Sequence, residues 1–305
     1  MVKLVTAFSP KGGAGTSIIT TNLSIYLAQK GKKVLLMDAA PNGGSLHAYL
    51  NLPSYAVSDE VAEHFSILPL IGSDYQNLSF FSNLRSASGT SKVYEHLTRW
   101  KTELKQSQFD FIFIDMGAHI DDDLFEMIGL SDYSLMFICP DPVSIEKSNY
   151  FMKQLFNHRL KNIEQKYDLS FSVQNLKRSR KPLLFTPRNL LLLLSEASPR
   201  HSSHIAAVIN DVKLGVVYNE IKSSSERDIA NIYQLLVRNS YGFETVLMGE
   251  LSYSDVITSS INNMKPVVTF EKKGDFVDAL DTIGSNLSHQ LFQKKREIGD
   301  YDKKS

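Results

Sequence analysis

Apolar runs and helical patterns alternate along the chain, and this alternation predicts an α/β fold. The apolar runs are mostly unbroken, as is typical of parallel strands that are covered by helices on both faces. The expected strands are Lys3–Phe8, Lys33–Met37, Leu78–Phe81, Phe109–Ile114, Ser134–Cys139, Val212–Tyr218 and Glu244–Met248. Helical periodicity predicts helices over residues 17–29, 91–106, 121–129, 143–159, 225–239, 253–263 and 275–294. We therefore expect three layers, with a mostly parallel central sheet between two layers of helices.

Residues 160–207 interrupt this alternation. The segment has several basic residues and no acidic residue between Asp168 and Glu196. Thr186 followed by Pro187 is a typical helix start, so one short helix is expected there. We interpret 160–207 as an insertion in a single domain that spans 1–292. A polar tail, 293–305, follows the last expected helix.

The composition is typical of a soluble globular protein, with 43% apolar and 22% charged residues among 305. Lys plus Arg equals Asp plus Glu, at 33 each, so the chain as a whole shows no preference for a polyanionic partner. Cys139 is the single cysteine, which excludes an intrachain disulfide and fits a reducing cytosol. We therefore expect a cytoplasmic location, with peripheral association at the inner membrane or cell pole left open.

A glycine-rich loop lies between the first expected strand and the first expected helix. It reads Ser-Pro-Lys-Gly-Gly-Ala-Gly-Thr-Ser over residues 9–17. Strand, glycine-rich turn and helix in this order are typical of a phosphate-binding loop, whose backbone N–H groups face an anion. An ordinary turn between a strand and a helix is the alternative. The residues expected to hold a nucleotide are Gly12, Gly13, Ala14, Gly15, Thr16 and Ser17.

Two aspartates end apolar strands. Asp38 follows the second expected strand, and Asp115 ends the fourth. Open α/β sheets bind ligands at the carboxyl ends of their strands, and carboxylate oxygens suit Mg²⁺. We expect Ser17, Asp38 and Asp115 to surround a Mg²⁺ ion, with Asp38 taking part in catalysis.

The loop resembles the deviant Walker A motif of the MinD/ParA family of P-loop ATPases, in which a lysine precedes the glycines. Lys11-Gly12-Gly13-x-Gly15 carries the resemblance, and 216–219 is similar to the strand whose final Asn reads adenine. The resemblance implies a P-loop NTPase fold that binds ATP and Mg²⁺, with Asn219 at the base. It also implies an ATP-dependent homodimer in which Lys11 reaches the phosphates of the other subunit in trans.

Two departures from the family pattern concern catalysis. Thr16 stands where the usual phosphate-binding lysine would be, and Ala40 replaces the second Asp of the family's Asp-x-Asp, which orients water. Single charged groups can contribute about 10³–10⁵ in the rate of phosphoryl transfer. We therefore predict a nucleotide-binding switch with weak ATPase activity or none. A competent ATPase using an acid from 121–123, and an adaptor without nucleotide, are the alternatives.

Within the family, the chain is most similar to the FlhG/FleN-like branch, which regulates flagellar number and placement. The loop itself is also similar to that of the CpaE/TadZ pilus-assembly proteins, and a ParA-like partitioning ATPase is a third alternative. The resemblance implies a protein partner from a polar, flagellar or pilus system. The apolar face of 293–305 is poor, so membrane association has no clear anchor. We assign the basic run in 177–188 to a soluble loop rather than to nucleic-acid binding.

Overall fold

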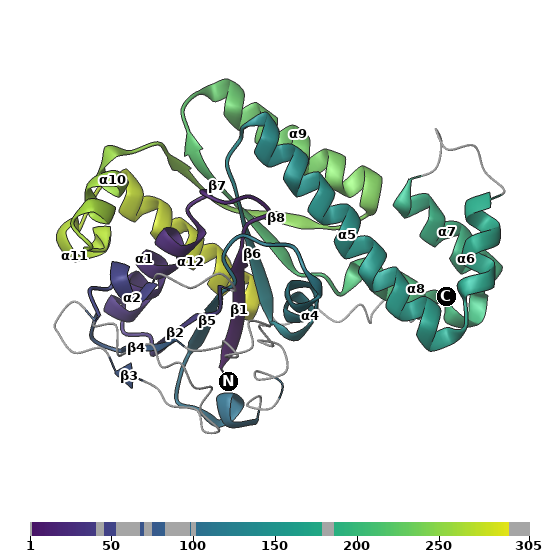
Figure 1. The fold of residues 1–305 in the computed structure, drawn as a ribbon, viewed down its shortest axis with the longest axis horizontal. Coiled ribbons are helices and arrows are strands. Elements are labelled where there is room, and N and C mark those ends of the chain that lie inside the picture. The colour runs from purple at the N-terminus through teal and green to yellow at the C-terminus, as the bar shows by residue number, and fades with distance from the viewer. Residues whose placement is uncertain are drawn as a thin grey trace, which may run out of the picture.

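A computed structural model describes residues 2–40, 46–52, 68–69, 75–82, 98, 102–178 and 186–292. In the described part of the chain, eight strands form one sheet in the order β3-β4-β2-β5-β1-β6-β7-β8 (Figure 1). All neighbouring strands are parallel except β3 and β4, which are antiparallel. The strands are β1 Lys3–Phe8, β2 Val34–Asp38, β3 Leu68–Pro69, β4 Leu78–Ser82, β5 Phe111–Asp115, β6 Tyr133–Ile138, β7 Leu214–Ile221 and β8 Thr245–Ser252.

The predicted α/β architecture is confirmed, and each of the seven predicted strands is present. Every residue of β2, β5 and β6 is buried, which is the burial that unbroken apolar runs predict. The strand β3 was not predicted. It has only two residues, one of them Pro69, and proline is tolerated at the edge of a sheet but carries no strand signal of its own.

Helices cover both faces of the sheet, as expected. They are α1 Thr16–Gln29, α2 Leu46–Tyr49, α4 Asp122–Leu130, α5 Pro142–Tyr167, α6 Ser170–Arg178, α7 Pro187–Ala197, α8 Ser202–Asn210, α9 Ser224–Tyr241, α10 Asp255–Asn262, α11 Val267–Phe270 and α12 Asp275–Phe292. A short 3₁₀ turn spans Pro199–His201. The helix expected over 91–106 falls mostly outside the described residues, and the tail 293–305 lies wholly outside them.

Alternate side chains of the central strands enter two separate cores. Val34 and Leu36 of β2 pack with α1 and α12, whereas Leu35 and Met37 pack with α4, α5 and α9. In Figure 1, α1 and α10–α12 lie on one side of the sheet, and α4, α5 and α9 lie on the other. The two cores hold the strand ends in fixed positions, and the loops that follow β1, β2 and β5 meet at one edge.

The segment 160–207 contains more helix than was predicted, so the expectation of one short helix is wrong. The helix α5 continues to Tyr167, and α6, α7 and α8 follow it. Arg159 of α5 donates to the carbonyl oxygens of Ala207 and Val208, at 2.8 and 2.6 Å, near the end of α8. Helices of nine residues are marginal in isolation and depend on such packing, which a local sequence pattern does not reveal.

The described basic residues of 177–188 are divided between two helices. Lys177 and Arg178 end α6, and Arg188 lies in the first turn of α7, while 179–185 fall outside the described residues. Among the helices that the structure describes, none combines the length and the apolar character that crossing a bilayer requires.

Candidate functional site

The glycine-rich loop joins β1 to α1 and forms one wall of a hollow of about 340 Å³. Gly13 and Gly15 have φ angles of 83° and 82°, in the left-handed region that favours glycine. Gly15 is the N-cap of α1, and its carbonyl accepts the first helical bond, from Ile19. The loop and the first turn of α1 therefore present backbone N–H groups and the positive end of a helix dipole to the hollow.

A hydrogen bond from Asn219 supports the glycine-rich loop. Asn219 is buried near the end of β7, and its side-chain Nδ2 donates to the carbonyl oxygen of Ala14 at 3.1 Å. A Cβ atom added to Gly15 would lie only 2.4 Å from this Nδ2, so the glycine is required by close approach as well as by φ. Asn219 also lines the hollow, and its buried Oδ1 has no partner among the described residues.

The far wall of the hollow comes from the chain after β8 and from α10. Tyr253, Ile257 and Ile261 provide apolar surface, and Ser254 and Thr258 provide hydroxyl groups. These wall residues were not predicted from the sequence. Their spacing of four along α10 marks one helix face, but only the packed sheet brings that face opposite the glycine-rich loop.

The two aspartates that end β2 and β5 lie side by side in the sheet register, as their positions predicted. Asp115 is completely buried, and burial together with the neighbouring Asp38 raises its pKa to about 7. The Ser17 hydroxyl and the Gly117 amide favour the ionised form and offset part of this rise. Asp38 is also buried and accepts a hydrogen bond at 3.1 Å from the backbone N–H of Leu46.

These residues suit a magnesium ion. One carboxylate oxygen of Asp115, Oδ2, is buried without a hydrogen-bond partner in the described part of the chain. Mg²⁺ is commonly held by one or two carboxylates together with substrate phosphates and water. No group of three or more His, Cys, Asp or Glu side chains in the described ranges could hold a metal by itself. The arrangement therefore favours an ion that is shared with a phosphate ligand.

Thr16 and Ala40, the two positions that depart from the family pattern, lie at the site and have uncharged side chains. Thr16 is buried and lines the hollow. A Cβ atom added to Gly117 would lie 3.1 Å from the methyl carbon of Ala40, so Ala40 adjoins the backbone just after Asp115. Neither side chain can supply the positive charge or the carboxylate that a competent phosphoryl-transfer site uses.

The three acids suggested as replacements for the missing carboxylate are engaged elsewhere. Asp121 is the N-cap of α4, accepts from the N–H of Leu124 at 2.9 Å, and pairs with His119 at 3.3 Å. Asp122 lies 3.4 Å from His158. None of residues 121–123 is among the described residues that line the hollow, and all three lie at the N-terminus of α4, where acids complement the helix dipole.

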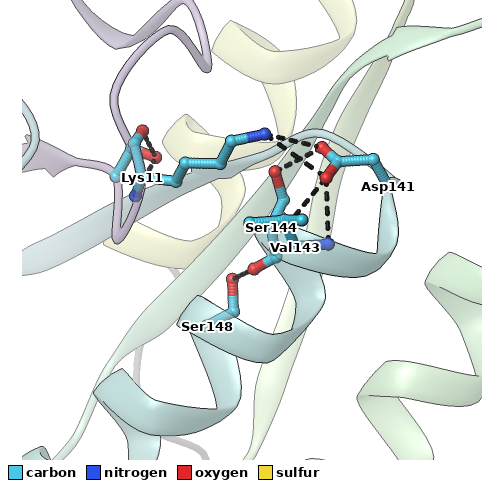
Figure 2. Close-up of polar contacts among 6 residues, drawn as sticks. Lys11, Asp141, Val143, Ser144 and Ser148 are labelled. Atoms are coloured by element: carbon cyan, nitrogen blue, oxygen red, sulfur yellow. Dashed lines mark hydrogen bonds and ion pairs between the residues drawn. The ribbon is translucent and has the colours of Figure 1, made fainter.

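Lys11 projects from the loop toward the start of α5 and pairs with Asp141 of the same chain (Figure 2). Its Nζ lies 3.3 and 3.2 Å from the two carboxylate oxygens. Asp141 is also the N-cap of α5 and accepts hydrogen bonds from the backbone N–H groups of Val143 and Ser144, both at 3.0 Å. Asp141 was not predicted as a site residue, although an Asp before Pro142 at a helix start is a recognisable cap.

The environment of Asp141 stabilises its ionised form. Burial alone would raise its pKa, but the hydrogen bonds from Ser144 and the charge of Lys11 outweigh it and lower the pKa to about 2. The Lys11 side chain is 37% exposed, so solvent and other molecules can reach it. The structure therefore places Lys11 at the rim of the hollow, with an intramolecular partner.

Comparison with known proteins identifies the family. The chain matches the CobQ/CobB/MinD/ParA nucleotide binding domain over residues 5–267. It is 31% identical to the septum site-determining protein MinD of Helicobacter pylori over 158 residues, which are 49% of this chain and 57% of that protein. It is 23% identical to the antiactivator FleN of Pseudomonas aeruginosa over 163 residues, or 50% of this chain and 56% of FleN. The chain thus spans about half the length of the curated relatives it matches.

The fold agrees with solved structures over almost the whole chain. The MinD protein of Pyrococcus horikoshii in complex with Mg-ADP superposes with a TM-score of 0.59, at 14% identity, covering 94% of this chain and 96% of that one. At this identity the likeness concerns the fold, and the sequence match concerns the family. The predicted P-loop NTPase fold is confirmed, and the chain belongs to the CobQ/CobB/MinD/ParA nucleotide-binding family.

Proposed function

We propose that this protein is an ATP-binding spatial regulator of the MinD/ParA type, a nucleotide-controlled dimeric switch with weak hydrolysis or none. The observation that carries the proposal is the composition of one hollow. The glycine-rich loop that lines it suits a nucleotide, and the nearby Asp38 and Asp115 suit Mg²⁺. Thr16 and Ala40 carry no charge beside them. A site of this kind binds a nucleotide without consuming it rapidly, which suits a protein that changes its partner according to nucleotide state.

The chain's own residues supply the binding steps. Backbone N–H groups of Gly13–Ser17 face the phosphates, and the loop is held open by the hydrogen bond from Asn219 to Ala14. Ser17, Asp38 and Asp115 would hold Mg²⁺, which would supply positive charge to the phosphates. The apolar side chains of α10 offer a flat surface to the base, and the amide of Asn219 remains our candidate for reading adenine.

Dimerisation requires a change of partner for Lys11. In the trans arrangement that we propose, its ammonium group leaves Asp141 and reaches a phosphate on the second subunit. An exposed ion pair such as Lys11–Asp141 contributes about 0.2–1 kcal/mol. Breaking it therefore costs little free energy compared with what a charge-assisted hydrogen bond to a phosphate contributes. The contact with Asp141 holds Lys11 near the rim and keeps it available for exchange.

Titration with Mg²⁺-ATP tests the proposal, with calorimetry for binding, sedimentation velocity for dimerisation and phosphate release for turnover. We expect binding and dimerisation without appreciable phosphate release. Turnover of order 1 s⁻¹, typical of a competent enzyme, would instead support the ATPase alternative. Absence of binding would support the adaptor without nucleotide.

The variant Lys11→Ala separates the two roles of the loop. We expect it to bind ATP but to lose nucleotide-dependent dimerisation, because the remaining loop still forms the cradle. Lys33→Ala is the matched control, since Lys33 is exposed and pairs with Gln108 at the opposite end of β2. Normal ATP-dependent dimerisation of Lys11→Ala would exclude the role in trans.

The cellular process is the finer part of the proposal. We favour flagellar number and placement or polar positioning, with pilus assembly and partitioning as alternatives. Both the MinD and the FleN relatives match at comparable length, so they support the regulator class rather than one process. Neighbouring genes would separate the alternatives, because flagellar and pilus systems are encoded in recognisable groups. A protein partner at the cell pole or inner membrane follows from the same proposal.

A further inference from the structure

The helix α9 carries a second apolar face that no other element of the described part of the chain covers. Its inner face is buried against the sheet and α5 through Ala230, Tyr233, Val237 and Tyr241. On the outer face, four large aliphatic side chains remain 39–62% exposed, namely Ile229, Ile232, Leu235 and Leu236. In Figure 1, α9 lies along the outer edge of the molecule beside α5. Contiguous exposed apolar surface of this kind marks an interaction site.

The outer stripe, defined by these four side chains, has the symmetry of a surface that pairs with itself. Ile229 and Leu235 lie three residues on either side of Ile232. Asp228 and Arg238 carry opposite charges and lie at the two ends of the outer stripe. The residue midway between them in the sequence is 233, next to Ile232. With about 100° and 1.5 Å per residue, both charges fall on the same side of the stripe and about 15 Å apart. A two-fold axis near Ile232 therefore brings each charge opposite its complement.

A second hollow lies on the side of the outer stripe that carries Asp228 and Arg238. It can receive a charged side chain of a partner molecule. It has a volume of about 300 Å³ and is lined by Asn231, Gln234, Leu235, Arg238, Glu244 and Thr245. The side-chain Nε2 of Gln234 is buried and has no acceptor in the described part of the chain. Arg238 pairs with Glu244 at 3.2 Å, but a guanidinium has five N–H donors and can bind a second carboxylate. The hollow thus offers donors where the symmetry places Asp228 of the partner subunit.

We propose that a second copy of this chain binds the outer stripe, with the two α9 helices antiparallel about a two-fold axis near Ile232. The aliphatic side chains form the centre of the interface, and Asp228 of each copy enters the hollow beside Arg238 of the other. In such an isologous contact both copies use the same patch, so the patch must be complementary to itself. The opposite charges of Asp228 and Arg238 meet this requirement. A different protein would not need this symmetry.

The contact is separate from the nucleotide site. The four side chains of the outer stripe are absent from the residues that line the hollow at the glycine-rich loop. The self-association through α9 should therefore occur without nucleotide. The ATP-dependent dimers of the proposed function would be joined to one another by the same α9 contact. One pair of helices is a small interface, so reversible and concentration-dependent association is expected.

Disulfide trapping tests the geometry directly. The single native cysteine, Cys139, is buried, and burial raises its pKa to about 11, so it reacts slowly. In Ile232→Cys, the two engineered thiols meet at the axis, and a mild oxidant such as diamide should produce a covalent dimer without nucleotide. Leu192→Cys is the matched control, because Leu192 is 56% exposed on α7 and lies off the axis. Equal trapping of both variants would overturn the proposal.

Sedimentation velocity without nucleotide tests the chemistry of the contact. We expect Ile232→Asp to weaken self-association about tenfold or more, with an unchanged melting temperature because the residue is exposed. Asp228→Arg should weaken it by placing like charges opposite each other, and adding Arg238→Asp should restore it. A chain that remains monomeric at millimolar concentration and is not trapped would refute the proposal and leave the stripe to another protein.

Discussion

Replacing Asp141 by alanine removes two interactions at once, the N-cap of α5 and the ion pair with Lys11. Losing an N-cap of this kind costs about 1 kcal/mol. The lowered pKa of Asp141 would correspond to at most about 2.5 kcal/mol if it were converted directly. Because the two side chains are 37% and 39% exposed, solvent screening reduces the ion-pair share to about 0.2–1 kcal/mol. We therefore expect Asp141→Ala to lower the free energy of unfolding by about 1–2 kcal/mol.

Asp141→Asn is the matched control, since asparagine caps a helix about as well as aspartate but carries no charge. Urea unfolding followed by circular dichroism measures both variants. We expect Asp141→Asn to retain most of the stability that Asp141→Ala loses. An equal loss of stability in both variants would show that the charge, and not the cap, stabilises this helix start. It would refute the assignment of about 1 kcal/mol to the cap.

The same comparison has a pH dependence of definite sign. The folded-state pKa lies near 2, below the ordinary value for aspartate, so the contribution of the ionised form is complete above about pH 4. It is lost as the pH falls through the folded-state pKa. The stability difference between the wild-type protein and Asp141→Asn should therefore shrink between about pH 4 and 2. A difference that grows on acidification would contradict the assignment.

Two further predictions concern the nucleotide site. Gly15→Ala should cost more than about 1 kcal/mol and abolish ATP binding, whereas Gly31→Ala should cost less, because Gly31 has nearly the same φ, 85°, but open space around it. Thermal unfolding and calorimetry compare the two, and equal costs would exclude the clash with Asn219. Thr16→Lys together with Ala40→Asp should raise phosphate release at least about tenfold. An unchanged rate in this double variant would mean that another feature suppresses turnover.

Much of the site could be predicted because it follows from local order in the sequence. A glycine-rich loop between a strand and a helix needs no tertiary information, and strand-ending aspartates must lie at one edge of a parallel sheet. Asp38 and Asp115 are adjacent in register for this reason. The helix α12 was predicted in the same way, from helical periodicity over 275–294, and Phe276, Leu280 and Ile283 on its inner face are buried.

The partners of these groups depended on contacts between distant segments. Lys11 and Asp141 are 130 residues apart, and Asn219 and Ala14 are 205 apart, so no local pattern predicts either hydrogen bond. The raised pKa of Asp115 likewise arises from complete burial beside a second carboxylate. Short helices such as α6 and α8 exist because α5 and α7 cover their apolar faces.

The sequence by itself determined the layers of this protein, the glycine-rich loop between β1 and α1, and the two positions, Thr16 and Ala40, that depart from the family pattern, because each rests on residue type and order. The tertiary structure decided what each side chain of the site contacts. It paired Lys11 with a helix cap, placed Asn219 beneath the loop and left one face of α9 uncovered. Those outcomes depend on distances between segments that only the packed sheet and its helices bring together.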